Sequence, residues 1–301
     1  MALLAAGGIG VSFSRAWTTP RRIVTVTLAR FNSSYLLACF LLERSVFGLR
    51  NTEVPLADNT PIQQMALGGL HESIVRSIKQ HVPVEGGANV LDLGAGSGAL
   101  SQKLDAAGYR VDACDMFPEL FQCQGIECRK ADVHEPLPYE SDRFDSVVAV
   151  EVVEHLESHL GLFEEVQRIL KPGGSFIFST PNISSLKSRF RFLLTGYFYS
   201  HGPLDPTVHD PVSQHIAAFT PDRYQFILAR SGLELKTVET DKFQSTSMWL
   251  SGLSPIIRFL CNRKFGKSKG TEMQNSPASL LGRTMIGIAT KPSQAEMKKA
   301  G

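Results

Sequence analysis

The stretch that most constrains this chain is Asn89–Gly98, with the sequence NVLDLGAGSG. An apolar run bounded by glycine is typical of a short strand buried in a parallel sheet. Glycines at alternate positions then let the backbone turn sharply and let a ligand approach it closely. Residues 99–108 have helical composition, so the stretch predicts a strand, a glycine loop and a helix. Gly94, Gly96 and Ala99 also satisfy the G-x-G-x-x-G/A dinucleotide pattern, so this motif alone leaves the cofactor open.

Strands and helices alternate along the chain after this motif. The predicted strands cover residues 89–93, 109–115, 125–133, the first part of 144–156, 175–182, 233–240 and 283–290. The predicted helices cover residues 61–82, 99–108, about 15 residues that begin within 144–156 and end before Lys171, and 221–231. This alternation predicts an α/β fold with a doubly wound, mostly parallel sheet. The last strand is expected to return antiparallel at the edge of that sheet.

Breaks in this rhythm divide the chain. Residues 61–240 are expected to form the core, with an inserted substrate lid at 183–218. A basic and apolar excursion with the final strand follows at 241–291, and 292–301 is a polar tail. Residues 1–60 start without acids and carry arginines, so they resemble a targeting peptide or a disordered leader.

The charge is uneven. The whole chain has a net charge of +2, but residues 1–42 carry +4 and residues 242–301 carry +8, so the middle is acidic. An acidic body is poor support for a nucleic-acid partner, whereas the basic C-terminal part suits an anionic surface. The five cysteines form no C-x-x-C pair, which favours ordinary thiols in a reduced compartment over zinc. We therefore expect a cytoplasmic protein, with the mitochondrion as the alternative.

Four acids stand at or just after the ends of predicted strands: Asp92, Asp115, Asp132 and Glu151. In open parallel sheets, ligands bind outside the carboxyl ends of the strands. A single such acid is equally well explained as a helix cap or a turn residue, but four in register indicate a ligand site. A dinucleotide would bring a pyrophosphate to the glycine loop. S-adenosylmethionine brings an ammonium and a sulfonium instead, so the acids favour S-adenosylmethionine.

Each position has an expected role toward this cofactor. Asp92 would hold the ammonium group, and backbone amides of the glycine loop would approach the methionine part. Asp115 would accept hydrogen bonds from the ribose hydroxyls, with Met116 against the adenine. Asp132 would bind the adenine amino group, and Val133 would pack on the ring. The expected cofactor-binding residues are Asp92, Gly94, Ala95, Gly96, Gly98, Asp115, Met116, Asp132, Val133 and Glu151.

Residues from about 85 to 240 resemble the class I S-adenosylmethionine-dependent methyltransferases. The motifs that carry the resemblance are VLDLGAGSG, VDACDM, ADV, FDSVVAVEVVEHL and LKPGGSFIFSTPN. The chain is most similar to the small-molecule branch, with the ubiquinone-type O-methyltransferases and those of bacterial surface-glycan clusters. The resemblance implies a Rossmann-like fold and methyl transfer to a small or lipid-linked acceptor, foremost at oxygen. The alternatives are an NAD-dependent oxidoreductase, which the missing Tyr-x-x-x-Lys pair disfavours, and a non-catalytic methyltransferase-like binding protein.

The acceptor side is expected around the end of the fourth strand. Glu151, Glu154 and His155 would share one helical face if a helix begins by Glu151. His155 suits a general base because histidine titrates near neutral pH, although a structural role explains it equally well. The expected catalytic residues are His155, Glu151 and His215. The resemblance permits a divalent metal on the E-x-x-E-H pattern, but we predict no metal site.

Two segments mix basic with aromatic and aliphatic residues: Leu186–Tyr199 and Met248–Phe265. Such a mixture suits an interfacial helix on an anionic membrane. A lid packed on the domain, with a solvated basic rim, explains the mixture slightly better, so peripheral membrane contact is a hypothesis. His201 and His209 lie in the inserted lid and are expected to be surface histidines without a role.

Overall fold

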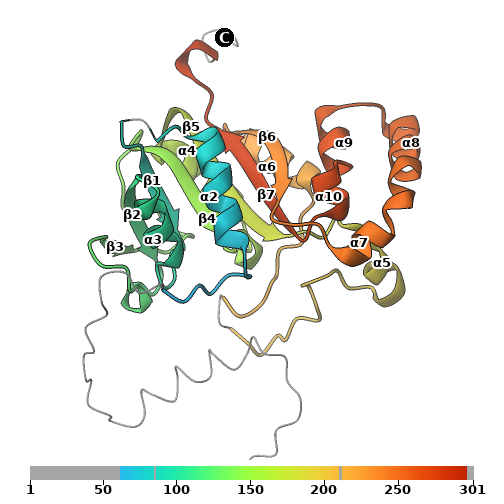
Figure 1. The fold of residues 1–301 in the computed structure, drawn as a ribbon, viewed down its shortest axis with the longest axis horizontal. Coiled ribbons are helices and arrows are strands. Elements are labelled where there is room, and N and C mark those ends of the chain that lie inside the picture. The colour runs from blue at the N-terminus through green and yellow to red at the C-terminus, as the bar shows by residue number, and fades with distance from the viewer. Residues whose placement is uncertain (1–61, 85, 210–211, 297–301) are drawn as a thin grey trace, which may run out of the picture. The chain divides into compact units, whose positions relative to one another are not determined.

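The structure, a computed structural model, describes residues 62–84, 86–209 and 212–296. The leader predicted for residues 1–60 lies outside the described residues. The centre of the fold is a seven-stranded sheet with the strand order β3-β2-β1-β4-β5-β7-β6 (Figure 1). Its strands are β1 (Asn89–Leu93), β2 (Arg110–Asp115), β3 (Cys128–Lys130), β4 (Phe144–Val150), β5 (Leu170–Pro181), β6 (Glu234–Thr240) and β7 (Thr284–Thr290).

The sheet is parallel from β3 to β5 and antiparallel on both sides of β7. This confirms the predicted doubly wound α/β fold with an antiparallel last strand. The predicted place of that strand was wrong, because β7 lies between β5 and β6, and β6 forms the edge. Four apolar residues of β7 are buried on its two faces, which a central strand requires: Met285, Ile286, Ile288 and Ala289.

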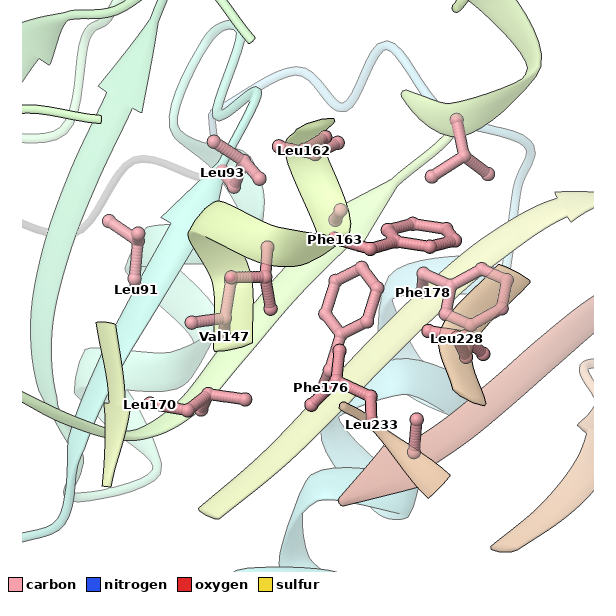
Figure 2. Close-up of a cluster of buried hydrophobic side chains, with 14 of the residues drawn as sticks. Leu91, Leu93, Val147, Leu162, Phe163, Leu170, Phe176, Phe178, Leu228 and Leu233 are labelled. Carbon is pink, nitrogen blue, oxygen red and sulfur yellow. The ribbon is translucent and has the colours of Figure 1, made fainter. Parts of the chain in front are cut away.

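Helices cover both faces of the sheet. On one face, α2 (Leu70–His81) and α3 (Ala99–Ala106) pack on strand residues such as Val90. On the other face, α4 (Leu160–Ile169) and α6 (Pro221–Arg230) pack on residues such as Leu91 and on a group of aromatic rings. Figure 2 shows this second cluster, in which Phe163 of α4 meets Phe176 and Phe178 of β5. Val90 and Leu91 thus alternate between the two layers, as successive strand residues do.

Two helices are shorter than predicted. The helix expected over 61–82 begins only at Leu70, directly after Gly69, whose φ of 85° is not helical. The helix expected to begin by Glu151 starts at Leu160, and only a short 3₁₀ turn, Val153–His155, lies before it. Glu151 itself has a φ of 54°, so no right-handed helix can pass through it. The prediction that Glu151, Glu154 and His155 share one helical face is therefore wrong.

The inserted segment begins with α5 (Leu186–Thr195), and its described residues from 196 to 209 and from 212 to 220 form no further helix or strand before α6. The later excursion contains α7 (Ser245–Trp249), a 3₁₀ turn (Ser251–Leu253), α8 (Ser254–Phe265), α9 (Lys269–Gln274) and α10 (Pro277–Leu281). Buried Asn182 anchors the excursion at the end of β5, because its side-chain amide donates to backbone carbonyls of Ala278, Ser279 and Gly282. Among the residues described, no helix is both long and apolar enough to cross a membrane.

Candidate active site

The glycine loop after β1 can form only with glycine at its turning points. Gly94, Gly96 and Gly98 have φ values of 75°, 52° and 83°, in the left-handed region that disfavours L side chains. A Cβ on Gly94 would also lie 2.5 Å from Cγ2 of Val152, on the turn after β4. The loop is thus folded tightly against the carboxyl ends of β1 and β4.

Asp115, the last residue of β2, is fixed against this loop by its side chain. Its Oδ2 accepts a hydrogen bond from the Gly96 N–H at 2.8 Å, and its Oδ1 accepts one from the Phe117 N–H at 2.8 Å. The loop is tied to β2 a second time, because the Gly94 and Ala95 N–H groups donate to the Cys114 carbonyl. These bonds hold a carboxylate beside the backbone of the loop.

Asp92 places a second carboxyl group close to Asp115. It is 1% exposed, and its Oδ2 accepts a hydrogen bond from the Ser101 hydroxyl at 2.6 Å. The pKa of Asp92 is raised to about 6, mainly by burial and also by the neighbouring charge of Asp115, against the hydrogen bond from Ser101. A cation bound between the two carboxyl groups would favour the charged form of Asp92.

Asp132 follows β3 but lies further from the loop interior, on the surface. Its Oδ1 accepts hydrogen bonds from the backbone N–H of His134 and contacts the His134 ring at Nδ1, both at 2.9 Å. These bonds lower the pKa of Asp132. Ala131 is tied to β2 through its N–H bond to the Asp115 carbonyl, and Val133 packs against the core. Asp132 therefore has both a turn-stabilising role and a place at the same end of the sheet as Asp115.

Glu151, at the end of β4, is held in a strained backbone conformation. Its φ of 54° is unusual for a residue with a side chain, and such strain is typical of functional sites. Its N–H donates to the Ser179 hydroxyl at 3.1 Å. Burial raises the pKa of Glu151, while the backbone of Leu67 and the guanidinium of Arg283 oppose this rise. The carboxyl group thus faces the segment before α2 and Arg283.

A separate group combines Glu154 and His155 with His215 from the inserted segment. One ligand atom from each of the three lies within 4.8 Å of the other two. The His155 and His215 rings are 4.9 Å apart, edge to face. Backbone bonds from the Ile216 and Ala217 N–H groups to the Glu154 carbonyl, both 2.9 Å, bring the insertion here.

The protonation states within this group follow from burial. Glu154 is fully buried, neither carboxyl oxygen has a hydrogen bond of normal geometry, and burial and the charge of Glu151 raise its pKa well above the usual range. The pKa of His215 is lowered to about 4, mainly by burial and also by His155 and His201. Burial therefore favours the uncharged form of both the Glu154 carboxyl group and the His215 imidazole.

Backbone carbonyl groups determine which ring nitrogen of His155 and of His215 carries the proton. Nδ1 of His155 lies 2.9 Å from the Gln214 carbonyl, and Nδ1 of His215 lies 2.9 Å from the Ser200 carbonyl. A carbonyl only accepts, so Nδ1 carries the proton in each neutral ring and Nε2 bears the lone pair. Both imidazoles can thus take a proton or bind a cation at Nε2.

His201 was expected on the surface, and this prediction was wrong. It is 7% exposed, its Nε2 lies 3.0 Å from the Ala217 carbonyl, and its ring lies 5.5 Å from that of His215. His209 is exposed, as predicted. Ser101 and Ser179 were missed as site residues. Ser101 lies nine positions after Asp92, in the first turn of the following helix, so this spacing could have predicted the contact between the two side chains.

Two hollows lie at different ends of the sheet. One of about 510 Å³ lies at the amino ends of the strands, beside Asn89, Asp145 and Lys171, away from the acids described above. A smaller hollow, of about 340 Å³, adjoins the histidine group, because two of its lining residues, Leu156 and Ile216, are the sequence neighbours of His155 and His215. It is lined by Leu156, Glu157, Ile216, Ala217 and Phe219.

Comparisons with known proteins complete the description of this site. Residues 70–238 match the model of a family described as "Methyltransferase domain". The chain is 28% identical over 190 residues to a ubiquinone biosynthesis O-methyltransferase of Xylella fastidiosa, covering 60% of this chain and 74% of that protein.

Other relatives share shorter stretches. A ubiquinone biosynthesis O-methyltransferase of Xanthomonas oryzae pv. oryzae is 34% identical over 105 residues, which cover 32% of this chain and 44% of that protein. The chain thus spans less than half the length of this curated relative. Among solved structures, a SAM-dependent methyltransferase from Archaeoglobus fulgidus aligns with a TM-score of 0.48 and 20% identity, covering 73% of this chain and 94% of that one.

Proposed function

Because this chain belongs to the methyltransferase-domain family, we propose that it transfers a methyl group from S-adenosylmethionine to an oxygen atom of a small or lipid-linked acceptor. The family membership confirms the class I methyltransferase resemblance, and S-adenosylmethionine is the cofactor of that class. The observation that carries the proposal is the carboxylate of Asp115, which Gly96 and Phe117 hold beside the glycine loop and close to buried Asp92.

The cofactor would lie across the carboxyl ends of β1, β2 and β4. Each Asp115 oxygen keeps a second lone pair beyond its backbone bond, which suits the two ribose hydroxyls. Asp92 would take the ammonium, whose charge removes the repulsion that Asp115 imposes. Met116, Asp132 and Val133 would border the adenine. Gly94, Ala95, Gly96 and Gly98 would line the methionine part, with Glu151 at the far end.

The acceptor would bind in the hollow beside the histidine group, whose volume of about 340 Å³ is in the range of small-molecule sites. Methyl transfer is an in-line displacement: the acceptor oxygen attacks the methyl carbon, the carbon–sulfur bond breaks, and S-adenosylhomocysteine leaves. We assign the acceptor's hydroxyl proton to Nε2 of His155. Positioning contributes most, because well-oriented reactants gain about 7–11 kcal/mol. His215 and Glu151 are the further catalytic candidates.

The same donors fit a divalent cation, although the sequence predicts no metal site, and a bound cation would occupy Nε2 of His155 and so exclude its role as the base. Two imidazole nitrogens and a buried carboxyl group without a hydrogen-bond partner form a set that suits such an ion. Glu154, His155 and His215 would hold it, and when bound it would stabilise the developing charge on the acceptor oxygen. Titration calorimetry with Zn²⁺ and Mn²⁺ tests this set. Binding of either ion that Glu154→Gln abolishes supports it, and binding unaffected by that change refutes it.

Three features support the finer parts of the proposal. The names of the Xylella and Xanthomonas relatives support oxygen as the methylated atom. A lipid-linked acceptor is supported by the exposed apolar and basic side chains of residues 186–199 and 248–265. A cytoplasmic place with peripheral membrane contact agrees with both, and the mitochondrion is the alternative. We propose no nucleic-acid partner, because the middle of the chain is acidic.

The decisive experiment is calorimetric titration with S-adenosylhomocysteine and, separately, with NAD. We expect micromolar binding of S-adenosylhomocysteine only, and its loss in Asp115→Ala. Asp105→Ala is the matched control, because Asp105 is exposed on α3 next to the same loop–helix unit. Folded protein that binds NAD instead, or neither ligand, would refute the proposed cofactor. Binding without methyl transfer to any screened quinone, phenol or lipid-linked sugar would favour the non-catalytic alternative.

A further inference from the structure

Helix α8 is unusual because none of its residues is buried. It nevertheless carries Ile256, Phe259 and Leu260, all more than half exposed, with Phe259 at 63%. These three residues and Arg263 have the spacing i, i+3, i+4 and i+7, which places them on one side of the helix. An apolar stripe of this kind normally packs against something, but within the described residues this one is left exposed.

Neighbouring elements continue this apolar surface. Trp249, at the end of α7, is 84% exposed, and Leu193, in α5, is 77% exposed. α5 contacts α7, and α7 and α8 both contact the 3₁₀ turn between them, so the three helices lie together at one end of the sheet (Figure 1). The Lys187 N–H donates to the Ser247 hydroxyl at 3.1 Å, which fixes α5 to α7. We call the exposed residues of 190–197 and 248–267 the apolar-basic face.

The charge of this face has one sign. The sequence contains no Asp or Glu in residues 186–204 or 242–271. Four basic side chains are exposed on the face, and none of them forms an ion pair with another described residue: Arg191, Arg263, Lys264 and Lys267. Arg189, by contrast, turns inward and donates to the Ser184 carbonyl. The face therefore combines exposed apolar side chains with uncompensated positive charge.

We propose that the apolar-basic face docks on an anionic lipid bilayer. Tryptophan, phenylalanine and leucine side chains enter the headgroup region, and basic residues bind its negative surface. A second copy of the chain would bring the same positive charge to the interface, which opposes pairing through this face. No described helix crosses a membrane, so this contact would be peripheral. If the proposed methyl transfer also holds, the acceptor is delivered from the bilayer.

The test is co-sedimentation of the full chain with vesicles at low salt. Vesicles of phosphatidylcholine alone are compared with vesicles that also contain phosphatidylglycerol. We expect binding to the anionic vesicles only, and a loss of binding at high salt. Arg263→Gln with Lys264→Gln should weaken binding by about fivefold for each charge removed. Arg76→Gln with Lys79→Gln, an exposed pair on α2, is the matched control and should change nothing.

Tryptophan fluorescence reports on the docking residue itself. The chain has two tryptophans, so Trp17→Phe leaves Trp249 as the sole one. Anionic vesicles should shift its emission to the blue, and brominated lipids should quench it. Trp249→Ala should weaken co-sedimentation, whereas Phe226→Ala, an exposed phenylalanine between Arg223 and Arg230 on α6, should not.

Three results would overturn the proposal. The first is equal binding to neutral and anionic vesicles, and the second is an unchanged Trp249 emission in the presence of anionic vesicles. The third is a protein that does not bind vesicles but forms dimers in sedimentation velocity, with the dimers lost in Trp249→Ala. Titration with S-adenosylhomocysteine in the absence of vesicles separates a failure of docking from a failure of the proposed enzyme. The substituted residues of the apolar-basic face, of α2 and of α6 lie outside the proposed cofactor site, so the affinity for S-adenosylhomocysteine should be unchanged in these variants.

Discussion

Replacing Gly94 by alanine adds a methyl group where the glycine loop meets the turn after β4. The φ of 75° at Gly94 makes an L side chain unfavourable by about 1–2 kcal/mol. The new Cβ would also lie 2.5 Å from Cγ2 of Val152, and overpacking of this kind destabilises by about 1–3 kcal/mol. We therefore expect Gly94→Ala to lower the free energy of unfolding by about 2–5 kcal/mol.

A matched control separates the two contributions. Gly125 has a φ of 79°, but a Cβ there would meet nothing within 4 Å. Gly125→Ala should therefore lose only the backbone part, about 1–2 kcal/mol. Val152→Ala in the Gly94→Ala background removes the clashing methyl groups and should restore about 1–3 kcal/mol, once its own effect is subtracted in a double-mutant cycle.

Urea unfolding followed by far-UV circular dichroism measures these differences, and calorimetry measures the affinity for S-adenosylhomocysteine. Gly94→Ala should also weaken that affinity, because the loop must move away from Val152. Equal destabilisation by Gly94→Ala and Gly125→Ala, with no recovery from Val152→Ala, would refute the tight packing of loop and turn.

Three other perturbations test the site and its support. The pKa of Asp92 is about 6 in the folded protein, against an ordinary value of 3.8, so folding favours the protonated form of this carboxyl group. The stability that Asp92 contributes is therefore fully present below about pH 4 and is lost as the pH rises through 6. Asp92→Asn should therefore stabilise the protein at pH 7 by about 2–3 kcal/mol in urea unfolding, remove that pH dependence, and weaken S-adenosylhomocysteine binding. Arg283→Met leaves buried Asp241 without its ion-pair partner and should destabilise by about 3–5 kcal/mol in the same assay, more than Asp241→Leu combined with Arg283→Met. His155→Asn should lower kcat by about a hundredfold or more while cofactor affinity stays constant, and a parallel loss of affinity would contradict its assignment as the base.

Local patterns in the sequence were sufficient for the alternation of strands and helices and for the glycine loop, but not for the place of β7 in the sheet. Apolar runs identified the central strands β1 and β4, because a strand buried on both faces needs consecutive apolar residues. The loop followed from Gly94 and Gly98, whose left-handed φ values few other residues adopt. The family resemblance rested on the same motifs, and the family match over residues 70–238 bears it out.

Contacts between distant parts of the chain could not be predicted in this way. The turn after β4 is not a helix because Glu151 has a positive φ and the Glu154 carbonyl bonds Ile216 and Ala217 instead. Those two residues lie more than sixty positions after Glu154, so the hydrophobic periodicity of the local sequence carries no information about this contact. The meeting of His215 with His155 and the burial of His201 follow from the same long-range contact. The electrostatic contact of Glu151 with Arg283 is also long-range, because Arg283 directly precedes the last strand.

The position of β7 has a consequence for how the chain is made. Among the described strands, β6 pairs only with β7, and the outer edge of β5 pairs only with β7. During synthesis, both edges stay unpaired until residues 284–290 have left the ribosome, long after β5 and β6 themselves. Unpaired strand edges are templates for aggregation. A nascent chain of this protein is therefore most vulnerable in that interval, when a chaperone that covers exposed edges would help most.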